Sequence, residues 1–234
     1  VVDPKTYMRM YNEALLTRNP DATPAYSLTK IERTGDPRYP SYVYPANDWY
    51  DILFKDYSVN HRVGVNVRGG SELMQYYASV NYTNDQGMLK TDRLNQFDVN
   101  IKNSTLSSRI NLNVDLNSAI RLLVNTSFSI DKYHGPLAET SEAYALAFNA
   151  SPVDFAPTYP GDKQYGWPHL RFGNIPGGPD SGVKNPYASL QAGYKERGRY
   201  SVTTRAEYIH NLSSLVKGLE LRASVSLSKT GYDM

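Results

Sequence analysis

The feature that most constrains the fold is an alternation of apolar and polar side chains, with a period of two residues, between positions 110 and 131. The odd-numbered positions in this stretch are almost all polar. The even-numbered positions are almost all apolar and read Ile110, Leu112, Val114, Leu116, Ile120, Leu122, Val124, Thr126, Phe128 and Ile130. Because successive side chains of a strand point to opposite faces of a sheet, the pattern predicts a β-hairpin with one apolar and one polar face, turning at Asn117-Ser118.

The length of the two arms indicates the environment of this hairpin. Strands of soluble sandwiches usually run about five or six residues. A tilted strand that crosses a bilayer needs about nine to eleven, and the two arms here are close to that length. We therefore predict an all-β fold, an antiparallel transmembrane β-barrel wall with its apolar row toward lipid and its polar row toward a water-filled lumen.

The same alternation appears elsewhere and predicts about six strands in all. The other strands are expected at residues 61–68, 74–83, 200–208 and 219–227, and the first strand of the central hairpin is expected to begin near residue 94. The apolar row lies on odd positions at Phe97, Val99 and Ile101 but on even positions from Leu106. Because a slip of one residue exchanges the two faces, we predict a bulge or break near Asn103.

Four segments follow from this pattern. Residues 1–60 are expected to form an extracellular helical and loop segment, with Asp3 and Asp48 as helix N-caps and with Trp49 and Phe54 tucked beneath it. Residues 61–132 are the barrel strands in two hairpins, residues 133–197 a long extracellular loop rich in Pro and Gly, and residues 198–234 a further barrel hairpin. The three short turns then lie on one side of the sheet and the long connections on the other.

Composition excludes several classes of protein. Among 234 residues with a mean hydropathy of −0.53, no run approaches the roughly 18 uncharged apolar residues of a spanning helix, which excludes a helical membrane protein. The 20 tyrosines are typical of aromatic girdles at membrane interfaces, and also of carbohydrate-facing or β-rich surfaces. A net charge of +2 favours no nucleic-acid partner. The absence of cysteine from the sequence excludes disulfides and thiol chemistry.

Nine short sequence pieces occur in an order and spacing that resemble the SusC/RagA family of TonB-dependent outer-membrane transporters. They are Tyr7-Met8 through Ala14, Arg38-Tyr39-Pro40, Asn47 through Leu53, Gly69-Gly70-Ser71, Tyr76 through Tyr82, Gln86 through Lys90, Arg109 through Leu112, Asn185-Pro186-Tyr187 and Lys217-Gly218-Leu219. The resemblance covers nearly the whole chain. Each piece is short, and the specificity lies in the ordered set.

The resemblance implies the setting of the predicted wall. It implies a parent barrel of about 22 strands around a plug, in the outer membrane of a Gram-negative bacterium. It also implies a SusD-like surface lipoprotein that closes over the barrel and delivers an oligosaccharide or peptide, and TonB, which acts on the plug. No cofactor is implied. Six strands with two open edges cannot close around a lumen, so we expect this chain to be a section of a longer polypeptide, without plug or TonB box.

The long loop carries the candidate substrate-binding residues. Sugar rings stack on aromatic faces, and their hydroxyls need planar polar partners. Residues of these kinds gather near Asp162 and are Tyr159, Tyr165, Trp167, His169, Arg171 and Phe172. The alternative is that these side chains pack the loop itself or contact the lipoprotein.

Two other functions were weighed against transport. A secreted, soluble β-sandwich that binds glycans would bury Leu112, Val114, Leu122 and Val124 beneath a second sheet. A serine acyl-transferase is suggested by Ser27-x-x-Lys30, Tyr82-Thr83-Asn84 and Lys229-Thr230-Gly231. Its serine should open a long buried helix, whereas Ser27 lies in a turn-rich stretch, so we predict no enzyme. The four histidines have no spacing with carboxylates that suggests a zinc site.

Overall fold

A computed structural model describes residues 3–91, 97–162, 164, 166, 168–175 and 184–233. The chain folds into two units, each assembled from three stretches of sequence. The loop unit comprises residues 1–56, 88–99 and 136–194, and the sheet unit comprises residues 57–87, 100–135 and 195–234.

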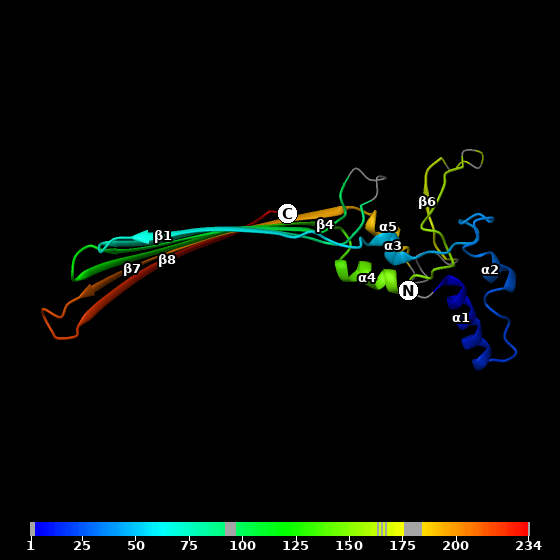
Figure 1. Ribbon diagram of the computed structural model, residues 1–234, viewed down its shortest axis with the longest axis horizontal. Coiled ribbons are helices and arrows are strands. Elements are labelled where there is room, and N and C mark those ends of the chain that lie inside the picture. Colours follow the sequence, from blue (N-terminus) through cyan, green and yellow to red (C-terminus); the bar gives the residue numbers. More distant parts are fainter. Residues whose placement is uncertain are drawn as a thin grey trace. The chain divides into compact units, whose positions relative to one another are not determined.

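The sheet unit is one antiparallel sheet in which each strand lies beside the strand before it (Figure 1). Its strands are β1 His61–Gly70, β2 Met74–Gln86, β3 Lys102–Asp115, β4 Ile120–Pro136, β7 Tyr194–Asn211 and β8 Glu220–Asp233. They are 10 to 18 residues long, well above the length usual in soluble sandwiches. The order β1-β2-β3-β4-β7-β8 leaves β1 and β8 as edges.

The register brings the apolar rows of all six strands onto one face. Ile110 lies opposite both Ala78 and Thr126, and the next residues of this row pair in the same way. The Oγ1 atoms of Thr126 and Thr204 are 3.3 Å apart, which carries the row from β4 into β7. Residues directly opposite one another share a face, so the polar rows, which are even-numbered on β1 and β8 and odd-numbered on the four strands between them, meet on the other side of the sheet.

Short turns join the strands within each hairpin. At the central turn, the side-chain oxygen of Asn117 accepts hydrogen bonds from the backbone N–H groups of Ala119 and Ile120 at 2.8 and 2.9 Å. Asn stabilises such a turn because its short side chain mimics a backbone carbonyl. In the last hairpin, Gly218 has φ of +82°, a conformation that residues with a Cβ rarely adopt.

The structure corrects the third predicted strand. β3 begins at Lys102, and its register with β2 continues unbroken to Val114, so no bulge lies at Asn103. Residues 97–101 lie outside any strand, and the part of the predicted strand at 92–96 lies outside the described residues. The change of phase that suggested a bulge arises because Phe97, Val99 and Ile101 precede the strand rather than belong to it.

The loop unit contains the helices and a two-stranded sheet. These elements are α1 Pro4–Arg18, α2 Leu28–Arg33, α3 Trp49–Leu53, α4 Thr140–Asn149, α5 Pro186–Leu190, β5 Thr158–Tyr159 and β6 Arg171–Phe172. Asp3 and Asp48 accept hydrogen bonds from the first backbone N–H groups of α1 and α3, as an N-cap does. Ser27 caps the six-residue helix α2 through the N–H of Lys30, which is a structural role for the serine of the acyl-transferase motif.

Aromatic and aliphatic side chains form the interior of the loop unit. Trp49 and Phe54 are 3% and 8% exposed, so both lie under the surface as predicted. The indole N–H of Trp49 donates to the carbonyl of Ser151 at 3.0 Å, and its ring lies 5.6 Å from that of Phe155. Among the described residues, no helix combines the length and the hydropathy needed to cross a membrane.

Candidate functional site

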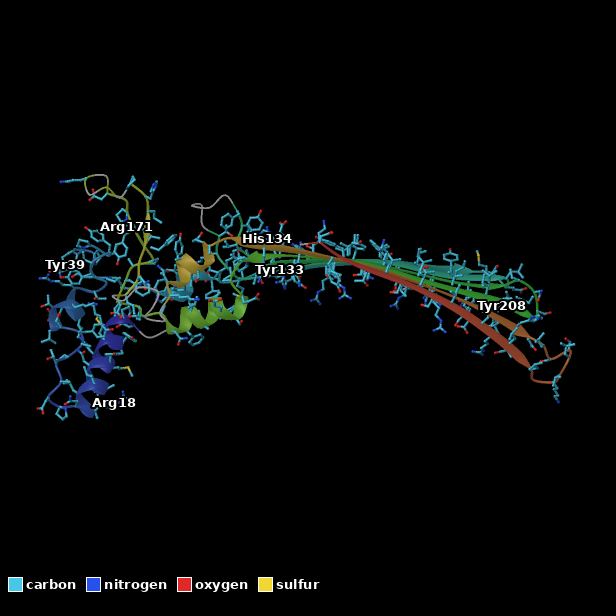
Figure 2. All side chains as sticks on the ribbon, turned by 180° about the vertical axis from the view of Figure 1, so that it is seen from behind. Arg18, Tyr39, Tyr133, His134, Arg171 and Tyr208 are labelled. Carbon is cyan, nitrogen blue, oxygen red and sulfur yellow. The ribbon has the colours of Figure 1, made fainter. Side chains whose placement is uncertain are left out.

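The apolar face of the sheet is exposed over most of its extent. Val65, Val225 and Leu227 are 67%, 68% and 74% exposed, and none of the central row from Ile110 to Ile130 belongs to the buried core. Side chains project from both faces of the strands (Figure 2). Contiguous apolar surface on this scale is rare on soluble monomers and marks a surface that contacts protein or lipid.

The sheet unit has a single layer. Its described residues form the six strands and their connections, and no second sheet belongs to this unit. Leu112, Val114, Leu122 and Val124 are half-buried by their neighbours within the sheet. The β-sandwich alternative required a facing sheet over these four side chains, and the unit does not contain one.

The opposite face of the sheet is polar and carries ion pairs. Arg121 contacts Asp115 at 2.6 Å, Arg205 contacts Glu207 at 3.2 Å, and Arg222 pairs with Glu220. Within this face lies a hollow of about 350 Å³. It is lined by Arg109, Asn111, Asn125, Thr126, Ser127, Thr203 and Arg205.

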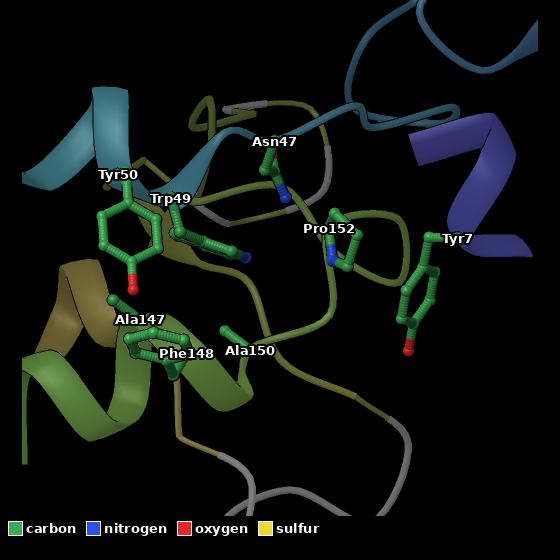
Figure 3. A pocket seen from close by; sticks show the side chains of 8 residues that line it. All are labelled: Tyr7, Asn47, Trp49, Tyr50, Ala147, Phe148, Ala150 and Pro152. Carbon is green, nitrogen blue, oxygen red and sulfur yellow. The ribbon is translucent and has the colours of Figure 1, made fainter. Parts of the chain in front are cut away.

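A second pocket, of about 550 Å³, lies in the loop unit (Figure 3). Its lining residues come from α1, the α3 region and the end of α4, and are Tyr7, Asn47, Trp49, Tyr50, Ala147, Phe148, Ala150 and Pro152. The rings of Tyr50 and Phe148 meet edge to face at 5.5 Å and 88°. Phe148 is 76% exposed, which leaves its ring available to a ligand.

Two polar groups distinguish this pocket from an apolar cavity. The hydroxyl of Tyr50 is buried and has no hydrogen-bond partner in the described part of the chain. Asn47 is 7% exposed and holds the pocket wall, since its backbone N–H donates to Pro152 at 2.8 Å and its side chain to the carbonyl of Phe155 at 2.6 Å. Aromatic faces beside an unsatisfied hydroxyl suit a ligand with rings and polar edges.

The predicted binding cluster on the long loop is brought together only in part. Tyr159 and Arg171 pair across β5 and β6 and therefore share one face of that ribbon. Phe172 pairs with Thr158, so it lies on the other face, where its ring is 6.1 Å from that of Tyr187. His169 is exposed just before β6, and Arg171 is also exposed. Two further members, Tyr165 and Trp167, lie outside the described residues.

No pattern in the sequence predicted the aromatic pocket around Trp49 and Phe148. Its walls come from segments up to 145 positions apart, from Tyr7 to Pro152, and no local pattern joins such segments. One signal was present: Asn47 and Trp49 stand together within one of the pieces that resemble the SusC/RagA family.

Two titratable groups described in the loop unit have a strongly displaced pKa. Burial raises the pKa of Tyr26, and the Asp154 carboxylate that accepts its hydrogen bond at 3.3 Å raises it further. Hydrogen bonds from the Arg38 side chain lower the pKa of Asp36 to about 2. The ring of Tyr26 belongs to the buried cluster with Met8, Ile31 and Val153, and its hydroxyl donates to the half-buried Asp154 at the edge of this cluster.

Comparison with known proteins supports the fold. No family model matches the chain. A TonB-dependent receptor, P26, of Formosa agariphila is 29% identical over 164 residues, which is 70% of this chain and 14% of the receptor. A structure of the RagAB peptide importer in its open-open state superposes with a TM-score of 0.56 and 16% identity, over 95% of this chain and 25% of the matched chain.

The fold is that of a barrel section. The prediction of an all-β, antiparallel wall with about six strands and short helices in its loops is confirmed by the strand order and by the match to RagAB. The chain spans only a small part of both proteins, 14% of the receptor and 25% of the RagAB chain.

Proposed function

We propose that this chain is part of the wall and outer loops of a TonB-dependent outer-membrane transporter of the SusC/RagA type. The transporter imports an oligosaccharide or peptide and works with a SusD-like surface lipoprotein, and TonB drives the import step. The wall binds lipid on one side and lines the passage on the other. The chain performs no chemistry on its substrate.

The observation that carries the proposal is the single-layered sheet with an exposed apolar face and a polar face. Tyr76 and Tyr208 lie toward the short turns, and Tyr82 and Tyr200 toward the long connections; Tyr208 is marked in Figure 2. All four belong to the apolar row. At ~3.3 Å per residue, the two tyrosines of β2 are roughly 20 Å apart along the strand, and the two of β7 are roughly 26 Å apart. Such a pattern is typical of an aliphatic band between aromatic girdles.

The topology supports an uptake role for the loops. All segments of the loop unit attach at one end of the strands, before β1, between β2 and β3, and between β4 and β7. In outer-membrane barrels the long loops are extracellular and the turns periplasmic, so this unit would meet substrate first. The solved relative is described as a peptide importer, which supports an oligomeric substrate.

Membrane insertion is tested with the full-length protein. It is expected to fractionate with outer membranes and to migrate differently on gels with and without boiling, because a folded barrel resists detergent. Single cysteines at Asn111 and Leu112 would then separate the two faces: a membrane-impermeant maleimide should label position 111, and a lipid-borne quencher should reach a probe at position 112. Equal water accessibility at both positions would contradict the proposal.

The loop cluster is a separate proposal for substrate contact. We propose that Tyr159 and Arg171, which share a face, contact substrate together with His169, Phe172, Tyr165 and Trp167. Arg171→Ala is expected to weaken substrate binding by about 1–3 kcal/mol, the value of a charge-assisted hydrogen bond. Binding of oligosaccharide and peptide libraries to the purified full-length transporter measures it, with Lys184→Ala on the same loop as control. Equal losses in both variants would assign the effect to general loop charge.

A further inference from the structure

The polar face of the sheet contains one arginine whose surroundings differ from those of its neighbours. Arg109 lies in the middle of β3, opposite Ser79 on one side and Ser127 on the other. Some arginines of this face have a carboxylate close by, such as Arg205 with Glu207 at 3.2 Å. Within the described part of the chain, the guanidinium of Arg109 has neither a hydrogen bond nor an ion pair.

The hollow around Arg109 is built from hydrogen-bond donors. Asn111 and Asn125 pair across β3 and β4, and Ser127 stands opposite Arg109 itself. Because Thr126 and Thr204 are opposite one another, Thr203 and Arg205 border the same hollow from β7. No carboxylate belongs to the lining of this hollow, and the hydroxyl of Thr203 is 3.0 Å from that of Ser228.

An unpaired guanidinium beside amides and hydroxyls is suited to one class of ligand. Its planar fork matches two oxygens of a carboxylate or sulfate group, and neighbouring amide N–H and hydroxyl groups can donate to the same oxygens. Arg109 is exposed on this face, and a cation set against a low-dielectric protein wall attracts anions more strongly than one surrounded by water on all sides.

We propose that Arg109, with Asn111, Asn125, Ser127 and Thr203, forms an oxyanion-binding site on the inner wall that takes a carboxylate or sulfate group of the passing solute. This inference rests on the proposed function, since it requires the polar face to line a water-filled passage. It adds a charge preference: acidic oligomers bind the wall in preference to neutral or basic ones.

The absence of cysteine from this chain permits a direct test. Ser129→Cys, next to Ser127 on the same face of β4 and outside the proposed site, is introduced into the full-length protein in a background free of other cysteines. The thiol is titrated with an anionic sulfonatoethyl methanethiosulfonate and with its cationic trimethylammonium counterpart. We expect the anionic reagent to react faster, and Arg109→Gln to reduce the ratio of the two rates about tenfold, given a charge one strand away. Sodium sulfate should slow the anionic reagent more than sodium chloride at equal ionic strength.

Controls separate the site from general charge. Arg109→Lys should keep most of the rate ratio, and the double variant Glu220→Gln/Arg222→Gln, which removes an ion pair outside the hollow and no net charge, should leave it nearly unchanged. The sulfate measurement on Ser129→Cys alone needs no change at Arg109, so it stands even if Arg109→Gln does not fold. A ratio unaffected by Arg109→Gln, or a sulfate effect no larger than that of chloride, would overturn the site. A thiol unreactive toward both reagents would instead overturn the water-filled passage, and the site with it.

Discussion

Asn47 shows how one side chain holds together two distant parts of the loop unit. Its side-chain N–H donates to the carbonyl of Phe155, a residue that is fully buried. Its backbone N–H donates to the carbonyl of Pro152, so the irregular stretch before α3 is fixed against residues 152–155. Removing one partner of such a buried hydrogen bond lowers the stability of the folded protein by more than the bond contributes, because the other partner stays buried without a hydrogen bond.

Asn47→Ala is therefore expected to loosen residues 152–156. The Phe155 carbonyl would be left buried without a donor, at a cost of about 1–3 kcal/mol. Hydrogen exchange of the full-length protein, followed by mass spectrometry, should show protection in this segment falling about 5- to 150-fold. The control is Asn149→Ala, whose side chain bonds Ala145 on the exposed side of α4 and should change little. Similar losses in both variants would contradict the role of Asn47.

The Asp36–Arg38 turn should respond to acid. The Arg38 guanidinium lowers the pKa of Asp36 to about 2, so the folded state favours the carboxylate. Its contribution is complete above the ordinary value of ~3.9 and is lost as pH falls toward about 2. Carbon-13 NMR of aspartate-labelled protein should locate this titration, and Arg38→Gln should move it back toward ~3.9. A titration unchanged by that substitution would assign the shift to another cause.

At two places in this sheet, a glycine on one strand leaves room for a tyrosine ring on the neighbouring strand. Gly231 on β8 lies directly opposite Tyr200 on β7. A Cβ added at Gly231 would overlap the Tyr200 ring, and one added at Gly69 would meet the hydroxyl of Tyr76. The tyrosine covers the backbone that the glycine leaves bare, so each such pair acts as one packing unit.

Gly231→Ala is expected to destabilise the hairpin although alanine normally suits a strand better than glycine. Displacing the Tyr200 ring should cost about 1–3 kcal/mol. In a Tyr200→Ala background the same change should be neutral or stabilising by up to ~1 kcal/mol. Urea unfolding of the full-length protein in detergent, monitored by the gel shift on boiling, measures both. Additive effects in this double-mutant cycle would show that the pair does not act together.

The two faces of the whole sheet define how the molecule meets its surroundings. Phe128 and Ser129 are neighbours in the middle of β4, yet they face opposite sides. If the apolar face meets lipid, a charge on it has no water to solvate it, whereas a charge on the other face stays hydrated.

Phe128→Arg should therefore destabilise the membrane-inserted protein by about 2–4 kcal/mol, while Ser129→Arg should change stability by less than ~1 kcal/mol. Refolding into lipid vesicles across a urea series measures this difference. A control at Leu219→Arg, near the short turn, should lie between the two because the cost falls toward the interface. Equal effects at 128 and 129 would argue against a lipid-facing side.

The strands and their faces could be predicted from the sequence because both follow from a local period. The alternation at 110–131 determines which side chains share a face, and a slip of one residue would turn all of them over, which leaves one acceptable register. The start of β3 could not be located in this way. Residues 97–101 alternate like a strand but lie outside the sheet, since alternation is necessary for pairing and does not by itself provide a partner strand.

The candidate sites depended on contacts between segments far apart in the chain. Loops have no period, so the amino-acid order alone could not bring Tyr7, Tyr50 and Phe148 around one pocket or turn Phe172 away from Tyr159. Likewise, the sequence alone does not distinguish Arg109 from other polar residues. The register gives it serine neighbours, and the hollow beside it has no carboxylate in its lining. Local chemistry thus determines the two-faced wall, and long-range packing determines where that wall and its loops can bind a ligand.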